Sequence, residues 1–514
     1  MSQLFIYTLL ISCSLLTPLV SLMLSAPTRR WKTANASSLV GLFSALAIWL
    51  LTIFKVDVIN AFDFIHFTGV TSTVLLLVHF IGYVVLKYAQ QNFELDPDNK
   101  RFLQWFLITL ASVMMTIVSN HLLLLWLGWV AVSISLHQLL MFYPKRYRAA
   151  LAAHKKFIFA RTAETLLGIA FLIIYFEHGT ALIDDIFANY PVASLNLNLH
   201  IAALLIAVVV LIKCAQLPLH GWLIQVVESP TPVSALLHAG IINMGGLLLL
   251  VFAPLFSQSV PAQTLVLVVA SLSAVLAALI MMSITSIKVR LAWSTIGQMG
   301  LMLIECALGL YAIALLHLIA HSVYKAHAFL SAGETVNQHI MQNNVKQAAS
   351  KVDWQLATTV TGIALFIAIY FGFIAAPYSP WIILSGTAIV LLANRGLFAT
   401  PMKALIPVIG LVLTYITLKT GLSSILPNIQ HQYYWQFDAV VSLLFIGLLI
   451  AYLYLFVMKQ STLPRSVLSL LNAGFYLDEW STRITLRIWP IDLPKKQPKH
   501  QLQKGFKHDI SKQA

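Results

Sequence analysis

Long apolar segments constrain the fold of this chain more than any other feature. A segment of about 20 mostly apolar residues crosses a bilayer as an α-helix, because lipid offers the backbone no hydrogen-bonding partner. The 514-residue sequence contains about fifteen such segments, and only 10% of its residues are charged, against roughly 25% in a soluble domain. We therefore predict an all-α polytopic membrane protein, with spans centred near residues 13, 48, 77, 110, 131, 168, 209, 242, 273, 300, 322, 365, 387, 411 and 447.

The distribution of Lys and Arg residues predicts the orientation in the membrane, because cytoplasmic loops carry an excess of both. With the N-terminus outside, 27 of the 32 basic residues fall in cytoplasmic gaps or in the C-terminal tail, and two fall in the outer gaps. Lys155 and Lys156 are assigned to such a cytoplasmic gap, whereas Arg161, Lys213 and Lys325 fall inside spans. We expect the N-terminus outside and the C-terminus in the cytoplasm.

Composition also narrows the classes of protein that remain. The net charge of +14 follows from this orientation, so we do not expect nucleic-acid binding. Cys13, Cys214 and Cys306 lie far apart in apolar stretches, which predicts neither a disulfide framework nor a cysteine metal site. The first apolar segment lacks a basic start and a cleavage pattern, so we expect a first span and not a cleaved signal.

Four regions follow from this pattern. We expect N-terminal transmembrane helices over 1–100, a conducting core over 101–335 and C-terminal transmembrane helices over 336–458. The region 459–514 is a basic cytoplasmic tail that opens with a short amphipathic stretch. Two interpretations of the tail stay open: contact with anionic lipid, or docking of a partner subunit.

A small set of charges inside spans is the most informative feature for function, since a charge at bilayer depth is costly and usually has a role. Lys213 follows a dozen apolar residues and precedes Pro218, which cannot continue a regular helix. A lysine beside such a break can exchange a proton, although it could instead snorkel to the interface. His238 lies two turns into the next helix, where we expect a proton relay or a satisfied core histidine.

The strongest constellation is the string HLIAHSVYKAHAF. His317, His321 and Lys325 are spaced four residues apart, so they share one helix face at steps of about 6 Å. Single water molecules bridge groups at this separation, which predicts a hydrated proton path. Metal binding by the two histidines is less favoured, because a third ligand is missing and the lysine repels a cation. Simple packing is the other alternative.

Three further groups complete the list of candidates. Arg161 and Glu164 form an i, i+3 pair at the start of the sixth span. The pair is either structural, or Glu164 is the acidic partner of Lys213. His137 belongs either to the proton path or to the membrane interface. Glu305 stands in the tenth span with no partner that the sequence can name.

The strings KCAQLPLHGWLIQVVESPTPVSALLHAG, SIKVRLAWSTIGQMG and HLIAHSVYKAHAFLSAG resemble the antiporter-like membrane subunits of respiratory complex I and of Mrp cation/proton antiporters. The resemblance covers roughly residues 70–335. It implies inverted five-helix repeats with broken helices. It further implies proton translocation at mid-membrane, with Lys213 as the broken-helix lysine, His238 on the following helix, and His317, His321 and Lys325 as the bridging set.

Two departures from this family affect the expectation. The family has a glutamate after Gly128–Trp129 that pairs with the broken-helix lysine, whereas this chain has Val130. Glu164 and His137 are therefore the candidates for the missing acid. In the second half the family motifs are faint, and no role is assigned to Arg395 or Lys403.

A narrower resemblance is to DabB-type membrane subunits of DAB inorganic-carbon transporters, carried by LHQLLMFYPKRYRAALAAHKKFIFAR, WSTIGQMGLMLIECALG and HSVYKAHAFLSAGE. It implies a subunit of the bacterial inner membrane that conducts protons or sodium ions and energises uptake of CO2 or bicarbonate. The implied partner is a soluble zinc subunit of the DabA type with carbonic-anhydrase-like chemistry, so no cofactor or metal is expected in this chain. The alternatives are a proton-pumping subunit of an NADH:quinone oxidoreductase or hydrogenase complex, and a stand-alone cation/proton antiporter.

Overall fold

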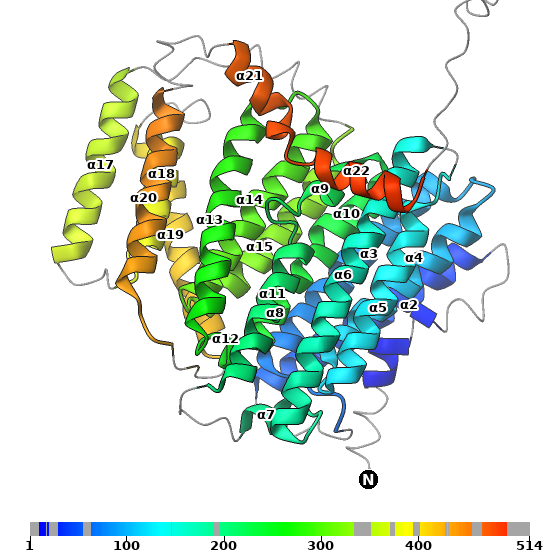
Figure 1. Ribbon diagram of the computed structural model, residues 1–514. Coiled ribbons are helices and arrows are strands. Elements are labelled where there is room, and N and C mark those ends of the chain that lie inside the picture. The colour runs from blue at the N-terminus through cyan, green and yellow to red at the C-terminus, as the bar shows by residue number, and fades with distance from the viewer. Residues whose placement is uncertain are drawn as a thin grey trace, which may run out of the picture.

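The computed structural model describes residues 10–16, 18–19, 29–54, 63–144, 146–188, 195–333, 351–370, 376–393, 401–426, 429, 431–454 and 465–490. Within these residues the chain is helical, with two isolated β-bridges and no extended strand. Most helices stand side by side in one bundle, and α22 crosses its upper end (Figure 1).

The membrane-spanning candidates make up most of the helices. The longer helices are α2 (Arg30–Ile53), α3 (Gly69–Phe93), α4 (Asn99–Val118), α5 (Leu122–Leu140), α6 (Tyr147–His178), α8 (Leu197–Lys213), α13 (Val260–Ser283), α14 (Ile287–Ala307), α15 (Tyr311–Leu330), α17 (Lys351–Tyr370), α18 (Ser379–Ala393), α19 (Pro401–Ser423) and α20 (Trp435–Tyr452). The shorter ones are α7 (Ile183–Ala188), α9 (Gly221–Gln225), α10 (Thr231–Ala239), α11 (Met244–Val251), α12 (Ala253–Phe256), α21 (Arg465–Asn472) and α22 (Glu479–Ile488).

Ten helical segments in the described part are long and apolar enough to cross a membrane, and α8 and α18 are shorter apolar helices. The all-helical, multi-span prediction is therefore confirmed, while the figure of about fifteen spans stays a prediction. Of the first expected span, residues 10–16 are helical. Arg395 lies outside the described residues, and the side chain of Lys403, in α19, is not described.

Successive loops between the spans lie at opposite ends of the bundle, so every second loop shares an end. The β-bridges Ile65–Ser119 and His121–Leu182 join three loops at one end. At the other end, the loops before α4, α6, α10 and α14 border an open cleft of about 700 Å³, whose lining includes Arg146 and Lys288. The gaps that the basic residues marked as cytoplasmic thus lie together, as alternating antiparallel spans require.

The helix that carries Lys213 is broken, as the proline predicted. After α8 the chain leaves helical geometry, Ala215 adopts a left-handed φ of 51°, and the helix resumes at α9. The freed backbone groups find partners inside the protein: the amide of Leu217 donates to the hydroxyl of Ser273 (2.9 Å), and Trp222 Nε1 donates to the carbonyl of Ile212 (3.1 Å). Non-helical backbone is tolerated at membrane depth when its polar groups are satisfied in this way.

One expectation about the loops was wrong. Lys155 and Lys156 do not lie in an exposed cytoplasmic gap but in α6, where both are buried. The 32-residue helix begins at Tyr147, so its first two turns project past the span and the two lysines already face the bundle. Their ammonium groups bind protein atoms, the Asp478 carboxylate and the Ser133 carbonyl, in place of bulk water.

The C-terminal arm, residues 465–490, forms α21, a short 3-10 turn and α22, and it docks on the bundle. Lys155 Nζ donates to both carboxylate oxygens of Asp478 (2.9 and 2.8 Å), and Gln225 of α9 donates to the same carboxylate (3.1 Å). A Cβ atom on Gly221 would lie only 1.3 Å from Asp478 Oδ1, so the missing side chain at Gly221 is what lets the carboxylate approach α9. The arm is therefore fixed to α6 and to the continuation of the broken helix.

We expect Asp478→Ala to release the arm. The side chain of Lys155 is 0% exposed, and removing its acidic partner leaves a buried charge without compensation, at a cost of about 3–5 kcal/mol. Hydrogen–deuterium exchange should show faster exchange of the α22 amides. Glu479→Ala is the matched control, because the exposed Glu479 carboxylate pairs only with exposed Arg483 among the described residues. Equal exchange in the two variants would contradict the assigned role of Asp478.

Candidate functional site

A buried ion cluster lies where α8 breaks. Lys213 is the last residue of α8, and its Nζ lies 3.0 Å from Glu164 Oε1 on α6. Arg161 lies one turn before Glu164, with Nη2 2.5 Å from Glu164 Oε2. Ser133 of α5 donates its hydroxyl to Glu164 and accepts a 3.3 Å hydrogen bond from Lys213. The Glu164 side chain is only 3% exposed and that of Lys213 14%, whereas Arg161 is 34% exposed, so one buried carboxylate pairs with a largely buried cation and a partly exposed one.

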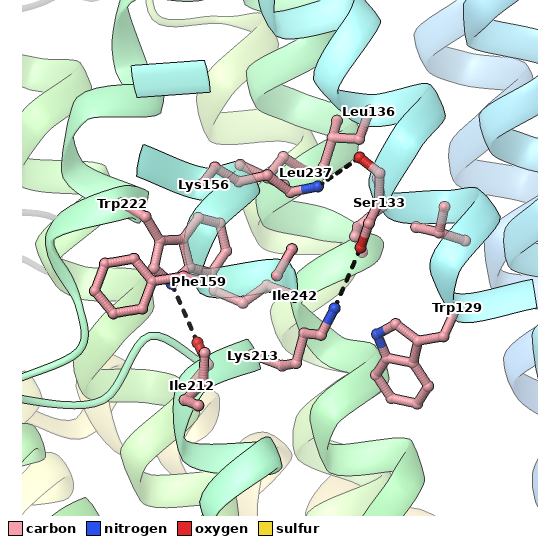
Figure 2. A pocket seen from close by; sticks show the side chains of 13 residues that line it. Trp129, Ser133, Leu136, Lys156, Phe159, Ile212, Lys213, Trp222, Leu237 and Ile242 are labelled. Carbon is pink, nitrogen blue, oxygen red and sulfur yellow. Dashed lines mark hydrogen bonds between the residues drawn. The ribbon is translucent and has the colours of Figure 1, made fainter. Parts of the chain in front are cut away.

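A third basic side chain enters the same cluster. Figure 2 shows Lys156 and Lys213 on opposite sides of Ser133, with the Lys156 ammonium donating to the Ser133 carbonyl at 2.9 Å. Lys156 is close enough to interact electrostatically with Lys213, Glu164 and Arg161. One carboxylate thus faces three basic groups, and the site is formed by α5, α6 and α8.

A small cavity adjoins these groups. It has a volume of about 30 Å³, and Figure 2 shows side chains that line it, including Trp129, Lys156, Lys213, Trp222 and Leu237. A cavity needs about 10–15 Å³ to hold a water molecule, so this one has room for water. Lys156 and Lys213 therefore border a space that can be hydrated.

The structure distinguishes the two candidates for the missing acid. Glu164 contacts Lys213 directly, whereas His137 Nδ1 lies 3.2 Å from the carbonyl oxygen of Ala153 and its ring lies beside His154. At the position on the fifth span where the resemblance implied a glutamate, this chain has Val130, and the carboxylate that contacts Lys213 comes from α6.

A second polar group lies between α10, α14 and α15. His238 Nδ1 lies 3.2 Å from the hydroxyl oxygen of Thr295. Lys325, which is fully buried, donates to the hydroxyl of Ser294 and to the carbonyl of Leu291 at 3.1 Å. Two consecutive hydroxyl side chains of α14 therefore face the histidine and the lysine.

The line of titratable groups on α15 continues from Lys325 to an acid. The rings of His317 and His321 have centroids 6.4 Å apart. His317 Nδ1 lies 3.2 Å from each carboxylate oxygen of Glu305, and Nε2 lies 2.9 Å from Gln298 Oε1. No partner of Glu305 could be named from the sequence; the fold places His317 beside it, because α14 and α15 run antiparallel from a shared loop.

His321 occupies the middle of this line. It is buried, and among the described residues neither ring nitrogen has a hydrogen-bonding partner in the protein. It lies within electrostatic range of Lys325, His317 and His238. An imidazole with both nitrogens available can accept a proton on one side and release one on the other.

The short helix α10 lies between the ion cluster at Lys213 and the polar group at Lys325. Leu237, which precedes His238, lines the cavity at Lys213, so α10 separates this cavity from the Lys325 group. On the other side of α10, Asn243 donates to Ser322 of α15 at 2.6 Å. The structure thus brings Lys213 and Glu164 together, and His238 near Lys325, on the two sides of one short helix.

Several residues of these groups were not singled out from the sequence: Lys156, Ser133, Ser294, Thr295, Gln298 and Asn243. Their signal is weak, since a hydroxyl or amide in an apolar span most often bonds its own helix. The string WSTIGQMG does hold three of them within one polar stretch of α14. In the described residues no group of three or more His, Cys, Asp or Glu side chains could hold a metal ion.

Comparisons with known proteins agree with this architecture. Residues 119–369 match the family described as "NADH:quinone oxidoreductase/Mrp antiporter, TM". The fold resembles a chain of the Mrp complex from a Dietzia species with a TM-score of 0.65 and 18% identity, covering 97% of this chain and 61% of that longer chain. Together with the broken helix and the buried lysines, these matches identify the chain as an antiporter-like membrane protein.

More specific similarity comes from curated relatives. The chain is 45% identical over 472 residues to the probable inorganic carbon transporter subunit DabB of Hydrogenovibrio crunogenus, covering 90% of this chain and 91% of the relative. It is 35% identical to DabB2 of Halothiobacillus neapolitanus, over 83% and 80%. Subunit L of the Mycobacterium tuberculosis NADH-quinone oxidoreductase is 34% identical, over 51% and 42%. The chain belongs to the DabB family.

We expect Glu164→Ala to destabilise the protein strongly. It leaves Lys213 and Arg161 without their carboxylate in a low-dielectric site, and the free energy of unfolding should fall by about 3–5 kcal/mol. Thermal unfolding in detergent measures the change. Combining Glu164→Gln with Lys213→Met removes both charges of the buried pair, leaves the partly exposed Arg161 without its carboxylate, and should recover much of the loss.

Glu177→Ala is the matched control, because Glu177 lies on the same helix and its exposed carboxylate accepts hydrogen bonds from Asn196 and Asn198. This variant should melt close to the unmodified protein. If Glu164→Ala melts at the same temperature as Glu177→Ala, the cluster does not hold the helices together.

Proposed function

We propose that this chain is the cation-conducting membrane subunit of an inorganic-carbon transporter. It carries protons or sodium ions down their gradient and energises uptake of CO2 or bicarbonate by a soluble, zinc-containing partner subunit. The observation that carries the proposal is the buried Lys213–Glu164 pair at the break of α8, in a chain of the DabB family. We infer the transported substrate, inorganic carbon, from the relatives, which are named as probable subunits of inorganic carbon transporters.

The charge balance of the cluster supports a role in conduction. Two unit charges 4 Å apart interact by about 4 kcal/mol at an effective dielectric constant of 20. Separating Lys213 from Glu164 is therefore costly unless another positive charge takes its place. A proton or cation that arrives at Glu164, or a proton that leaves Lys156, changes the electrostatic energy of the Lys213 ammonium. The charge state of the cluster is therefore coupled to the broken helix.

The path we propose runs through the groups named above. A proton passes between bulk water, His238 and Lys213, and along the line of Lys325, His321 and His317. Glu305, beside His317, extends this line by one acid. Water in the 30 Å³ cavity serves the lysine end. On α15 the rings of His317 and His321, with centroids 6.4 Å apart, are spaced for a bridging water molecule.

The partner and the orientation belong to the same proposal. The zinc and the carbonic-anhydrase-like chemistry reside in a soluble subunit of the DabA type at the cytoplasmic face, and this chain is no enzyme by itself. The end of the bundle that gathers the basic loops and the C-terminal arm is the cytoplasmic end, in the bacterial inner membrane. The N-terminus then lies outside.

A redox-driven proton pump is the second candidate. Similarity to subunit L of NADH-quinone oxidoreductase supports it, but covers only 51% of this chain, whereas the DabB relative covers 90%. The two candidates share the conduction path and differ in the partner that drives it or is driven by it.

We expect Lys213→Ala and Lys325→Ala each to reduce uptake of labelled bicarbonate at least tenfold in cells that need the transporter at ambient CO2. Both variants remove a buried charge that the path requires. Lys87→Ala is the control, since Lys87 is exposed at the end of α3. Uptake that is unchanged, with normal amounts of protein in the membrane, would reject the path.

We expect the intact complex, purified in mild detergent, to contain a soluble subunit with about one bound zinc ion. Mass spectrometry identifies the subunits and elemental analysis the metal. Deleting residues 491–514 tests whether the basic tail holds the partner, because the deletion leaves the arm in place. Iron–sulfur or quinone-binding subunits in place of a zinc protein would favour the redox pump.

A further inference from the structure

Helix α22 packs polar side chains against the bundle and leaves large apolar side chains exposed. Ser481 and Thr485 are buried against the bundle, and Asp478 and Thr482 bond Lys155. A stripe beside this docked face is exposed and apolar: Trp480, Ile484 and Ile488 recur every four residues and are 40, 42 and 63% exposed. Tyr476, in the 3-10 turn before α22, is exposed as well. A helix on a soluble protein normally turns its apolar stripe inward.

A line of charged residues runs beside this apolar stripe. Glu479, Arg483 and Arg487 also recur every four residues and are exposed, and Arg483 Nη2 lies 2.8 Å from Glu479 Oε2. The outer surface of α22 is therefore half apolar and half charged along its length. Helices that lie in the plane of a membrane interface have this division, with aromatic and aliphatic side chains next to arginines.

The position of α22 places it at the edge of the hydrocarbon core. Trp489 stacks on His154 at 3.8 Å, and Trp480 contacts Phe159, so α22 crosses α6 between these residues. Spanning the hydrocarbon takes about 20 residues. Counted back from the end of α6 at His178, 20 residues reach the level where α22 crosses. Figure 1 shows α22 lying across the bundle at this end.

We propose that α22 is an interfacial membrane helix. It buries Trp480, Ile484 and Ile488 in one leaflet of the bilayer, while Arg483 and Arg487 face anionic phospholipid headgroups. Charge complementarity favours such lipid, because six lysines follow α22 in the sequence between Lys495 and Lys512.

The polar side of α22 then ties this lipid contact to the conduction site. Asp478 holds Lys155 of α6 and Gln225 of α9, and α9 is the continuation of the helix that ends at Lys213. Movement of α22 in the interface thus bears on α6, which carries Glu164, and on α9, which follows the break after Lys213. The lipid contact of α22 and its attachment to α6 and α9 are both independent of the substrate that the complex transports.

The test uses the full chain in nanodiscs with and without phosphatidylglycerol. The native cysteines are replaced, and a nitroxide spin label is attached to cysteine at Ile484, Ile488, Arg483 or Phe176, one site at a time. Collision rates with oxygen, which concentrates in lipid, and with a water-soluble nickel chelate report the surroundings. We expect labels at 484 and 488 to match the lipid reference at 176, with oxygen access several times higher and nickel access several times lower than at 483.

Two outcomes would overturn the proposal. Nickel access at 484 and 488 as high as at 483 would place the stripe in water. Low access to both reagents would mean that protein covers it. If the cysteine-free chain fails to fold, the unmodified protein is used with a photoactivatable phosphatidylglycerol, and cross-links should map to residues 480–488; cross-links confined to the spanning helices would contradict the proposal. Label mobility at 484 that is identical with and without phosphatidylglycerol would remove the requirement for anionic lipid.

Discussion

The fold rests on the need to neutralise charge inside a low-dielectric bundle. Among the described residues, Glu164 is the one carboxylate that pairs with Lys213 and Arg161, and Lys156 donates to the Ser133 carbonyl beside them. A buried pair of this kind adds little net stability compared with an apolar pair, but removing one member is costly. The arrangement therefore joins α5, α6 and α8 so long as the charge stays balanced. The same dependence on balance makes the site responsive to an arriving ion.

The break in α8 is the second consequence of lipid surroundings. Irregular backbone can exist at this depth because the side chains of Ser273, Trp222 and Gln216 satisfy the freed groups. The break exposes the end of the helix at Lys213 and lets α9 turn toward the C-terminal arm, where Gly221 leaves space for Asp478. Backbone irregularity, ion pair and arm are thus parts of one contiguous structure.

Position along the membrane normal explains why polar side chains serve different roles. Near mid-span, Lys325, His238 and His321 face hydroxyls, carbonyls and one another. Near the interface, Lys155 binds an acid from a surface helix whose other face is apolar. The first environment retains few fixed countercharges and suits transfer of positive charge. The second provides a firm countercharge and suits attachment.

The sequence alone determined the class of fold, because runs of about 20 apolar residues have no other stable arrangement than spanning helices. It also determined that a charge is buried at Lys213 and that α8 breaks there, since Lys213 and Pro218 are local signals, whereas the burial of Lys155 and Lys156 came only with the fold. Pairings between distant segments were decided only by the tertiary structure: Glu305 with His317, Asp478 with Lys155, and Glu164 in place of an acid at Val130. The reason is physical: helical periodicity fixes which residues share a face, but not which helix that face meets.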